Sequence, residues 1–329
     1  MRAESGGRVN GPAPDERAPD ATVLDEVTLV RVPGLPGLYR RALALAARRK
    51  IGREPVPIGL QPVRHRVDGI VTDVEALTRF QQVLGSAARD RVPSAYLHTL
   101  AFPVAMSVLA RADFPLPLLG MVHLSNEVHQ SRQVDAFETL DVVARAEDLR
   151  PHPAGTQVDL VTEVSVGTEL VWTGRSVYLA RGVRSGPVGS GEGRDGGRPA
   201  FSTPAPTGVW RLGADTGRRY AAVSGDWNPL HLSGPTAKVL GMKTAIAHGM
   251  YLAARMVDQA VPAPSGAMDW RIEFATPVLL PGVVTTSFSA KGHTTGRDGV
   301  RDARPYRVDV VGWDAKRRRT HFVGWVRAG

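Results

Sequence analysis

Residues 220–250 read YAAVSGDWNPLHLSGPTAKVLGMKTAIAHGM, and the interpretation of the whole chain depends on this stretch. Asp226 and His231 lie five residues apart, and His248 and Gly249 follow at the head of an apolar run. A carboxylate and an imidazole can hold one water molecule and act as general base and general acid. A glycine at a helix start offers a backbone N–H that can stabilise negative charge on a carbonyl oxygen. The stretch therefore predicts a catalytic dyad of Asp226 and His231, with Gly249 as the N–H donor.

Four residues around the dyad are expected to orient it. Ser224 and Gly225 come directly before the aspartate, and Asn228 and Pro229 separate it from the histidine. Because proline restricts the preceding residue to an extended conformation, the loop should be rigid. Taken singly, such residues are typical of an Asx turn and of a structural histidine. Together, in this order and spacing, they favour a catalytic loop, with His248 orienting the turn before the glycine.

The order of predicted elements divides the chain into two similar halves. Each half contains a long apolar helix followed by extended segments, which is an α+β pattern with antiparallel strands. The helices are expected at 93–112 and 249–261, and the strands at 122–134, 139–149, 157–166, 170–180, 269–276, 283–292, 306–313 and 320–326. A glycine-rich segment between the halves is typical of a flexible linker. The predicted organisation is a disordered tail (1–21), an N-terminal domain (22–183), the linker (184–200) and a C-terminal catalytic domain (201–329).

A direct comparison of the halves indicates that only one of them is catalytic. An offset of 140 residues sets 79–85 against 219–225, with an arginine, an aromatic residue, a valine and a glycine coinciding. At this offset Ser86 replaces the aspartate of the dyad and Arg91 replaces the histidine. A slightly different offset sets Pro103 against the glycine. The N-terminal half is therefore expected to repeat the scaffold without the chemistry.

The composition of the chain narrows the function classes. Hydrophobic residues make up 43% and charged residues 22% of 329 residues, which is ordinary for a globular protein of two domains. The absence of cysteine excludes disulfides, thiolate nucleophiles and thiolate metal ligands, and suits a cytoplasmic protein. The first 21 residues lack the apolar core of a secretory signal, and residues 97–110 are too short and too polar to span a membrane.

The net charge of +9 raises the question of a nucleic-acid partner. The basic residues are scattered, with one dense cluster at 316–319, and aromatic residues make up only 6% of the chain. They do not interleave with the basic residues as stacking platforms for bases would. A basic surface is equally suited to a nucleotide-bearing thioester or to an acidic carrier protein, so no nucleic-acid partner is expected.

Residues 220–231 resemble the signature of the MaoC-like, (R)-specific enoyl-CoA hydratases, and residues 247–250 and 274–282 fit in order and spacing. The resemblance implies a double hotdog fold, with two antiparallel sheets each wrapped around a long central helix. It implies reversible conversion of a trans-2-enoyl thioester to a (3R)-3-hydroxyacyl thioester in fatty-acid metabolism. The thioester would be carried by coenzyme A or acyl carrier protein, with no further cofactor, no metal and a homodimer as the candidate assembly.

One position departs from the family pattern. Some relatives carry a serine eight residues beyond the N–H-donating glycine, where this chain has Val257. We expect the change to alter substrate orientation or the preferred acyl chain while leaving the dyad intact.

Two other functions remain open from the sequence. A hotdog thioesterase generally places a carboxylate on or near the central helix, whereas residues 249–257 contain none and Asp258 comes late. A non-catalytic acyl-binding or assembly subunit would not need the dyad. The remaining histidines show no metal-ligand spacing and are expected to be structural. They include His98, His123, His129 and His152.

Overall fold

The computed structural model describes residues 24–184, 202–239, 241–261, 266–291 and 306–329. The predicted tail and nearly all of the predicted linker lie outside these residues. The division of the chain at 183/184 and 200/201 therefore stays a prediction. Among the described residues, no helix is long and apolar enough to cross a membrane.

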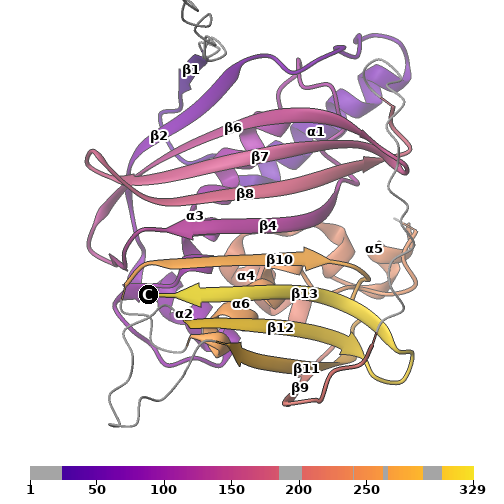
Figure 1. The fold of residues 1–329 in the computed structure, drawn as a ribbon. Coiled ribbons are helices and arrows are strands. Elements are labelled where there is room, and N and C mark those ends of the chain that lie inside the picture. Colours follow the sequence, from indigo (N-terminus) through magenta and orange to yellow (C-terminus); the bar gives the residue numbers. More distant parts are fainter. Residues whose placement is uncertain (1–23, 185–201, 240, 262–265, 292–305) are drawn as a thin grey trace, which may run out of the picture.

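One eleven-stranded sheet extends through both halves of the chain (Figure 1). Its strand order is β1-β2-β6-β7-β8-β4-β10-β13-β12-β11-β9, and all neighbours are antiparallel except β1 and β2. The strands are β1 (Asp25–Thr28), β2 (Val63–Val71), β4 (Val122–Gln130), β6 (Thr139–His152), β7 (Gly155–Val166), β8 (Glu169–Arg181), β9 (Gly208–Leu212), β10 (Met268–Phe274), β11 (Gly282–Lys291), β12 (Tyr306–Asp314) and β13 (Arg319–Ala328). Two short strands, β3 (Arg91–Val92) and β5 (Val134–Asp135), pair separately.

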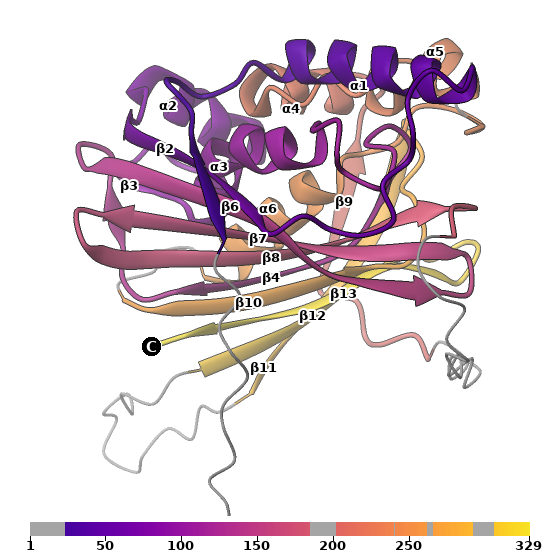
Figure 2. The same ribbon diagram turned by 90° about the horizontal axis from the view of Figure 1, so that it is seen from above.

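The described helices cover one face of this sheet (Figure 2). They are α1 (Leu35–Lys50), α2 (Val74–Leu84), α3 (Ser94–Leu109), α4 (Thr216–Ser224), the 3-10 helix η1 (Pro229–His231), α5 (Gly234–Val239) and α6 (Gly249–Ala260). Helices α3 and α6 pack against the sheet and against each other. Each half thus has one long central helix and an antiparallel run of strands, which confirms the α+β double hotdog.

The two halves are joined edge to edge. Strand β4 of the N-terminal half pairs with β10 of the C-terminal half, so the two predicted sheets form one continuous surface. Behind this joint, the indole N–H groups of Trp172 and Trp270 both donate to Oγ of Ser94, at 3.2 and 2.9 Å. One indole comes from each half, and Ser94 is the first residue of α3. The joint is therefore a buried, hydrogen-bonded part of the core.

The helices α2 and α4 end in the same way. The carboxylate of Asp73 accepts the backbone N–H groups of Glu75 and Ala76 at the start of α2, as an N-cap. Gly85 ends α2 with φ of 83°, and Gly225 ends α4 with φ of 73°, a left-handed conformation that favours glycine. The equivalence of 79–85 and 219–225 inferred from the sequence agrees with these two helix ends.

The second part of the sequence comparison was wrong. Gly249 is the first residue of α6, and the first residue of α3 is Ser94, so Ser94 and not Pro103 stands in the corresponding place. Pro103 lies inside α3. The predicted start of α3, at residue 93, is correct to within one residue. The chosen offset failed because η1 and α5 lengthen the loop before α6 and have no counterpart before α3. Strand β2 was also missed, because its buried positions include His65.

Candidate active site

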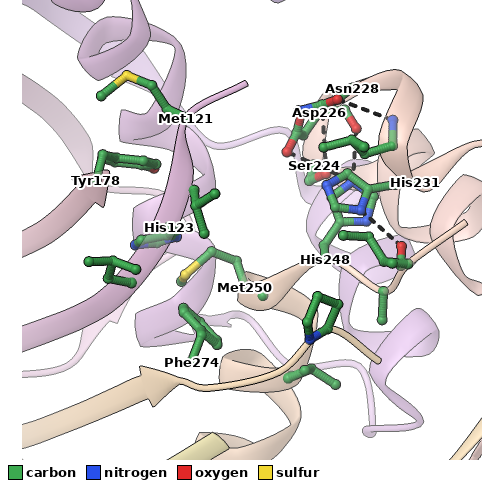
Figure 3. Close-up of a pocket in the computed structure, with 18 of the residues that line it drawn as sticks. Met121, His123, Tyr178, Ser224, Asp226, Asn228, His231, His248, Met250 and Phe274 are labelled. Atoms are coloured by element: carbon green, nitrogen blue, oxygen red, sulfur yellow. Dashed lines mark hydrogen bonds and ion pairs between the residues drawn. The ribbon is translucent and has the colours of Figure 1, made fainter. Parts of the chain in front are cut away.

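A cavity of about 370 Å³ opens at the joint between the halves (Figure 3). The N-terminal half contributes residues of α1, α3, β4 and β8. The C-terminal half contributes the dyad loop, the start of α6 and the end of β10. All three residues predicted to be catalytic line this cavity, as do Ser224, Asn228 and His248. Gly225 and Pro229 lie on the same loop and shape its backbone.

Asp226 follows the left-handed Gly225, and its backbone N–H donates to Oγ of Ser224 at 3.3 Å. Its Oδ1 accepts two hydrogen bonds, from the hydroxyl of Tyr39 at 2.8 Å and from the backbone N–H of Asn228 at 3.3 Å. The second bond is the Asx turn that the residue types suggested. Because Oδ1 is occupied in this way, Oδ2 is the carboxylate oxygen free for chemistry.

His231 is the last residue of η1, which begins at Pro229 behind an N-cap made by the Asn228 side chain. Its Nδ1 donates to the carbonyl oxygen of Ile246 at 2.9 Å. Burial lowers the pKa of His231, although the negative charge of Asp226 opposes this effect. The ring is therefore neutral near pH 7, with its proton on Nδ1 and a lone pair on Nε2.

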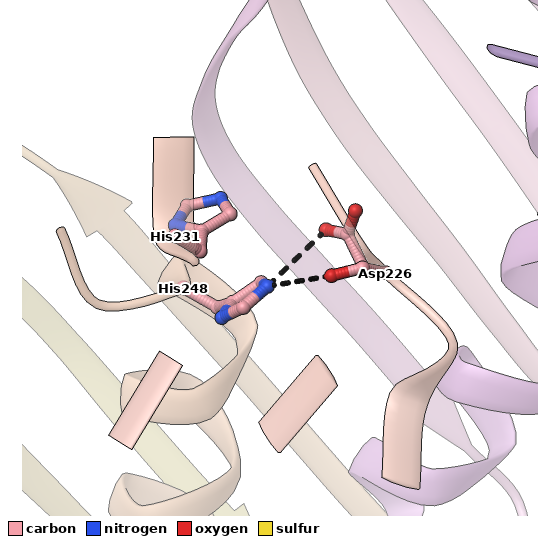
Figure 4. A group of neighbouring side chains, drawn as sticks. All are labelled: Asp226, His231 and His248. Carbon is pink, nitrogen blue, oxygen red and sulfur yellow. Dashed lines mark hydrogen bonds and ion pairs between the residues drawn. The ribbon is translucent and has the colours of Figure 1, made fainter. Parts of the chain in front are cut away.

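His248 connects the two members of the dyad (Figure 4). Its ring stacks on that of His231, with centroids 3.7 Å apart. Its Nε2 donates to the backbone carbonyl of Asp226 at 3.0 Å and lies 3.8 Å from Oδ2. Burial holds the pKa of His248 well below the ordinary value, and the neighbouring His231 adds to this effect. The side chain makes no cap hydrogen bond to α6, so it contacts the dyad loop and not the helix end.

Gly249 begins α6, where the first backbone N–H groups have no helical acceptor. A Cβ at this position would lie 2.9 Å from Cζ of Phe274, whose ring lines the cavity. Glycine is therefore the residue that lets the aromatic ring lie over the helix start. This packing is an additional reason for the glycine beyond the close approach of a substrate.

Asp226, His231 and His248 also raise the question of a metal site, because one candidate ligand atom from each lies within 4.8 Å of the others. A metal ion needs ligand lone pairs that converge on one point. The two imidazoles are stacked on each other, and each already donates one ring N–H to a backbone carbonyl oxygen, Nδ1 of His231 to Ile246 and Nε2 of His248 to Asp226. The arrangement suits a water molecule better than a cation.

Two further residues hold the dyad in place, and neither was found from the sequence. Tyr39 lies on α1. Burial and the Asp226 carboxylate hold the pKa of Tyr39 well above its ordinary value, so its hydroxyl only donates. Gly217 lies on α4, where a Cβ would come within 1.9 Å of the carbonyl oxygen of His231. Only the tertiary contacts reveal these roles. Tyr39 is 187 positions from Asp226 in the chain, and no sequence motif marks Gly217.

Two of the four histidines expected to be structural line the cavity. His98 from α3 and His123 from β4 both face it. His129 lies on the surface and forms a hydrogen bond with Asp269, and His152 accepts the N–H of Ala154 in a turn. The sequence did not predict that His123 faces the cavity, because its orientation depends on a β-bulge that a strand pattern does not reveal.

A second cavity, of about 570 Å³, occupies the corresponding place in the other half. Ser86, Arg91 and Ser94 line it where the catalytic cavity has its dyad and its glycine. Val257 and Asp258 line this second cavity and are absent from the lining of the first. The expectation that Val257 affects substrate orientation was therefore wrong. Since each central helix turns its later residues toward the opposite cavity, Phe102 of α3 lies in the catalytic one.

The sequence and the fold of the chain are similar to those of known proteins. The MaoC like domain matches residues 196–311. The 3-hydroxyacyl-thioester dehydratase X of Mycobacterium tuberculosis is 36% identical over 215 residues, which cover 65% of this chain and 76% of that protein. A crystal structure of HtdX from M. tuberculosis has a TM-score of 0.65 and 30% identity, covering 81% of this chain and 100% of that chain. A MaoC-like dehydratase from Phytophthora capsici (TM-score 0.60, 18% identity, 80% and 94% covered) shares the fold.

Proposed function

The chain belongs to the MaoC-like dehydratase family, and on this basis we propose that it is a hydro-lyase of fatty-acid metabolism. It interconverts a trans-2-enoyl thioester and the (3R)-3-hydroxyacyl thioester. The observation that carries the assignment of residues is the convergence of Asp226, His231 and the N–H of Gly249 on one cavity. The relative named above supports the reaction class, since it is a 3-hydroxyacyl-thioester dehydratase.

In the hydration direction, Asp226 and His231 hold the attacking water between them. A carboxylate oxygen and a ring nitrogen lie within 4.8 Å, and two hydrogen bonds of about 2.8 Å to one water span such a distance. Because Nδ1 of His231 is bound to Ile246, Nε2 is the nitrogen that takes a proton from the water. Asp226 then stabilises the imidazolium that forms.

The thioester oxygen gains negative charge as the hydroxyl adds to C3. The N–H of Gly249 donates to this oxygen, and the positive end of the α6 dipole adds to the effect. The enolate collapses as the dyad returns one proton to C2. One water is consumed, the dyad ends in its initial protonation state, and water and protons are the only reagents, so no cofactor is needed.

The rival functions have less support. The catalytic cavity has Asp226 as its one lining carboxylate among the described residues, and Asp258 on α6 lines the other cavity. A thioesterase would need a carboxylate on the central helix close to the thioester. A non-catalytic subunit would not need the hydrogen bonds that fix both members of the dyad.

The net charge of the chain and the reaction are compatible with either of two thioester carriers. Coenzyme A and the phosphopantetheine of acyl carrier protein present the same thioester, and a chain with net charge +9 suits both a nucleotide and an acidic carrier. Rates on the two carriers identify which one is used. A homodimer stays a prediction.

The loss of enoyl-thioester absorbance tests this function. The variants Asp226→Asn and His231→Ala should each lower kcat/KM by about 10²- to 10⁴-fold, as expected when a general acid or base is removed. Asp258→Asn is the matched control, since that carboxylate lines the second cavity, and it should change the rate less than about twofold. Near-wild-type rates in both dyad variants would refute the assignment, and release of free thiol without hydration would favour the thioesterase.

A further inference from the structure

The wall of the catalytic cavity opposite the dyad is not purely apolar. His123 and Tyr178 lie across the cavity from Asp226 and His231 (Figure 3), and His98 lines the same region from α3. The three rings form one group: His123 stacks on Tyr178 with centroids 4.5 Å apart, and on His98 at 6.5 Å. This group is called the imidazole wall below.

The backbone turns His123 into the cavity. Strand β4 pairs Asn126 with Ser176 and His123 with Tyr178, with a register shift between His123 and Ser125. An extra residue, Leu124, is inserted, and such a bulge reverses which side chains face the core. Without it, the inward alternation would place Leu124 opposite Tyr178. The chain therefore departs from regular strand geometry at the residue that brings an imidazole to the cavity.

The packing of α3 against the sheet does not require a histidine at position 98. His98 is the fifth residue of α3, and the fifth residue of α6, its counterpart in the other half, is Ala253. Both residues are buried, with exposed fractions of 7% and 0%. The same helix–sheet packing thus accepts a methyl group at this position in one half, whereas the catalytic cavity carries a polar ring.

Both imidazoles are neutral and have unused hydrogen-bonding capacity. Burial lowers the pKa of His98 to about 4 and that of His123 to about 3. Each Nε2 is shielded from water and has no hydrogen-bond partner among the described residues. Leaving such a group unpaired costs about 1–3 kcal/mol, which is why nearly all buried polar groups have partners. Met121 and Met250 lie beside this wall (Figure 3) and are flexible enough to make room for a ligand.

A plain alkyl chain packed here would leave both nitrogens unpaired, whereas a chain with a hydroxyl or keto oxygen would pair at least one of them. We propose that the preferred substrates are enoyl thioesters whose acyl chain carries a hydrogen-bonding oxygen beyond the reacting carbons. The inference rests on the proposed hydratase function and adds a substrate class to it. Sites built to bind a polar group reject the analogue that lacks it far more strongly than apolar pockets reject an extra methylene.

The position of the wall relative to the reacting atoms is set by Phe274. Its ring lies over Gly249, and its centroid is 5.2 Å from that of His123. The wall is thus about one aromatic ring away from the N–H that holds the thioester oxygen. The polar group should therefore lie in the first part of the acyl tail and not at the end of a long chain.

The test compares pairs of trans-2-enoyl-CoA substrates of equal length, one with a plain alkyl tail and one with a hydroxyl or keto oxygen at successive tail carbons. For the wild-type protein, kcat/KM should be tenfold or more higher for the oxygenated member at one position. His123→Phe and His98→Phe keep a planar ring and should bring that ratio close to one. His129→Gln, on the exposed side of the same strand β4, is the control and should leave the ratio unchanged.

The outcomes separate this inference from the proposed function. Equal rates for plain and oxygenated substrates at every position, in a wild-type protein that hydrates both, overturn the inference and leave the function standing. No hydration of any substrate overturns both. Variants that lose rate equally on both members of a pair also overturn the inference, because the wall would then contact the carrier or serve packing. If a variant fails to fold, the wild-type comparison alone decides.

Discussion

Replacing Tyr39 with phenylalanine removes one hydroxyl and keeps the ring that packs at the end of the cavity. This hydroxyl donates to Oδ1 of Asp226 at 2.8 Å, and the other donor to that oxygen, the N–H of Asn228, is longer at 3.3 Å. Leu35, one turn earlier on α1, approaches Gly225, whose Cβ would lie 3.5 Å from it. Two residues at i, i+4 spacing thus hold the dyad loop from outside, and Tyr39→Phe releases its strongest contact.

The size of the effect follows from the kind of bond that is lost. A hydrogen bond to a charged group contributes about 1.5–3 kcal/mol, and 1.36 kcal/mol corresponds to tenfold in rate. Full loss would therefore slow the reaction by about 10- to 150-fold. Because Tyr39 is placed to act through Asp226 and not on the substrate, the loss should appear in kcat, with KM changed less than about threefold.

The assay is steady-state hydration on a substrate that saturates the wild-type protein, together with thermal unfolding. Tyr251→Phe is the matched control, since Tyr251 is a buried tyrosine of α6 whose hydroxyl has only a 3.4 Å contact with Arg255. It is not among the residues that line the catalytic cavity. The control should keep its rate within about twofold. Tyr39→Phe should unfold within a few degrees of wild type, because cavity water can take the place of the hydroxyl.

A double-mutant cycle decides whether Tyr39 acts through Asp226. In an Asp226→Asn background the hydroxyl has no carboxylate to hold, so adding Tyr39→Phe should cost little more. An equal loss of rate in both backgrounds would show that Tyr39 acts elsewhere, and a Tyr39→Phe protein with wild-type kcat would refute the reasoning altogether.

Two further predictions concern the other half of the dyad. Gly217→Ala places a Cβ within 1.9 Å of the carbonyl oxygen of His231, so η1 must move by about an ångström, a displacement that typically costs about 10²-fold in rate. Gly37→Ala is the control, since a Cβ at that position would have nothing within 4 Å. Unchanged activity of Gly217→Ala would contradict the packing argument. The second is the pH dependence. His231 acts when neutral and burial lowers its pKa, so kcat/KM should be flat near neutrality and fall only below about pH 6.5, the ordinary value for histidine. An acid limb centred at or above that value would contradict the assignment. Stability should fall over the same range, because the buried histidines, His98 among them with a pKa of about 4, bind fewer protons in the folded than in the unfolded state, so the free energy of unfolding drops as the pH falls through 6.5.

The sequence alone determined the architecture because local signals agree with it over long stretches. Periodic apolar residues predicted α6 and eight of the thirteen described strands, and glycines in left-handed positions marked the ends of α2 and α4. The dyad was readable for the same reason: Asp226, His231 and the residues between them are held by short-range contacts, an Asx turn and a 3-10 helix capped by Asn228. Where the geometry of a site is made by neighbours in sequence, the sequence predicts it.

The features that the sequence did not predict depend on differences between the two halves or on contacts between residues far apart in the chain. The start of α3 was predicted to within one residue, but Pro103 was paired with Gly249 because η1 and α5 lengthen the loop before α6 and have no counterpart before α3. Val257 was assigned to the wrong cavity because each central helix crosses toward the opposite half. The bulge that turns His123 inward changes no residue type and leaves no mark in a period-two pattern.

Residues 220–250 thus contain all the groups predicted to react, but the residues that hold those groups in place lie outside this stretch or in the other half of the chain. The carboxylate of the dyad is held by Tyr39, 187 positions earlier, its histidine rests on Gly217, and the wall facing it comes from the half without a dyad. Hydrogen bonds and steric contacts act over a few ångströms in space, whatever the separation along the chain. The sequence therefore named the groups that react, and the tertiary structure decided which oxygen, which ring nitrogen and which cavity wall they present to the substrate.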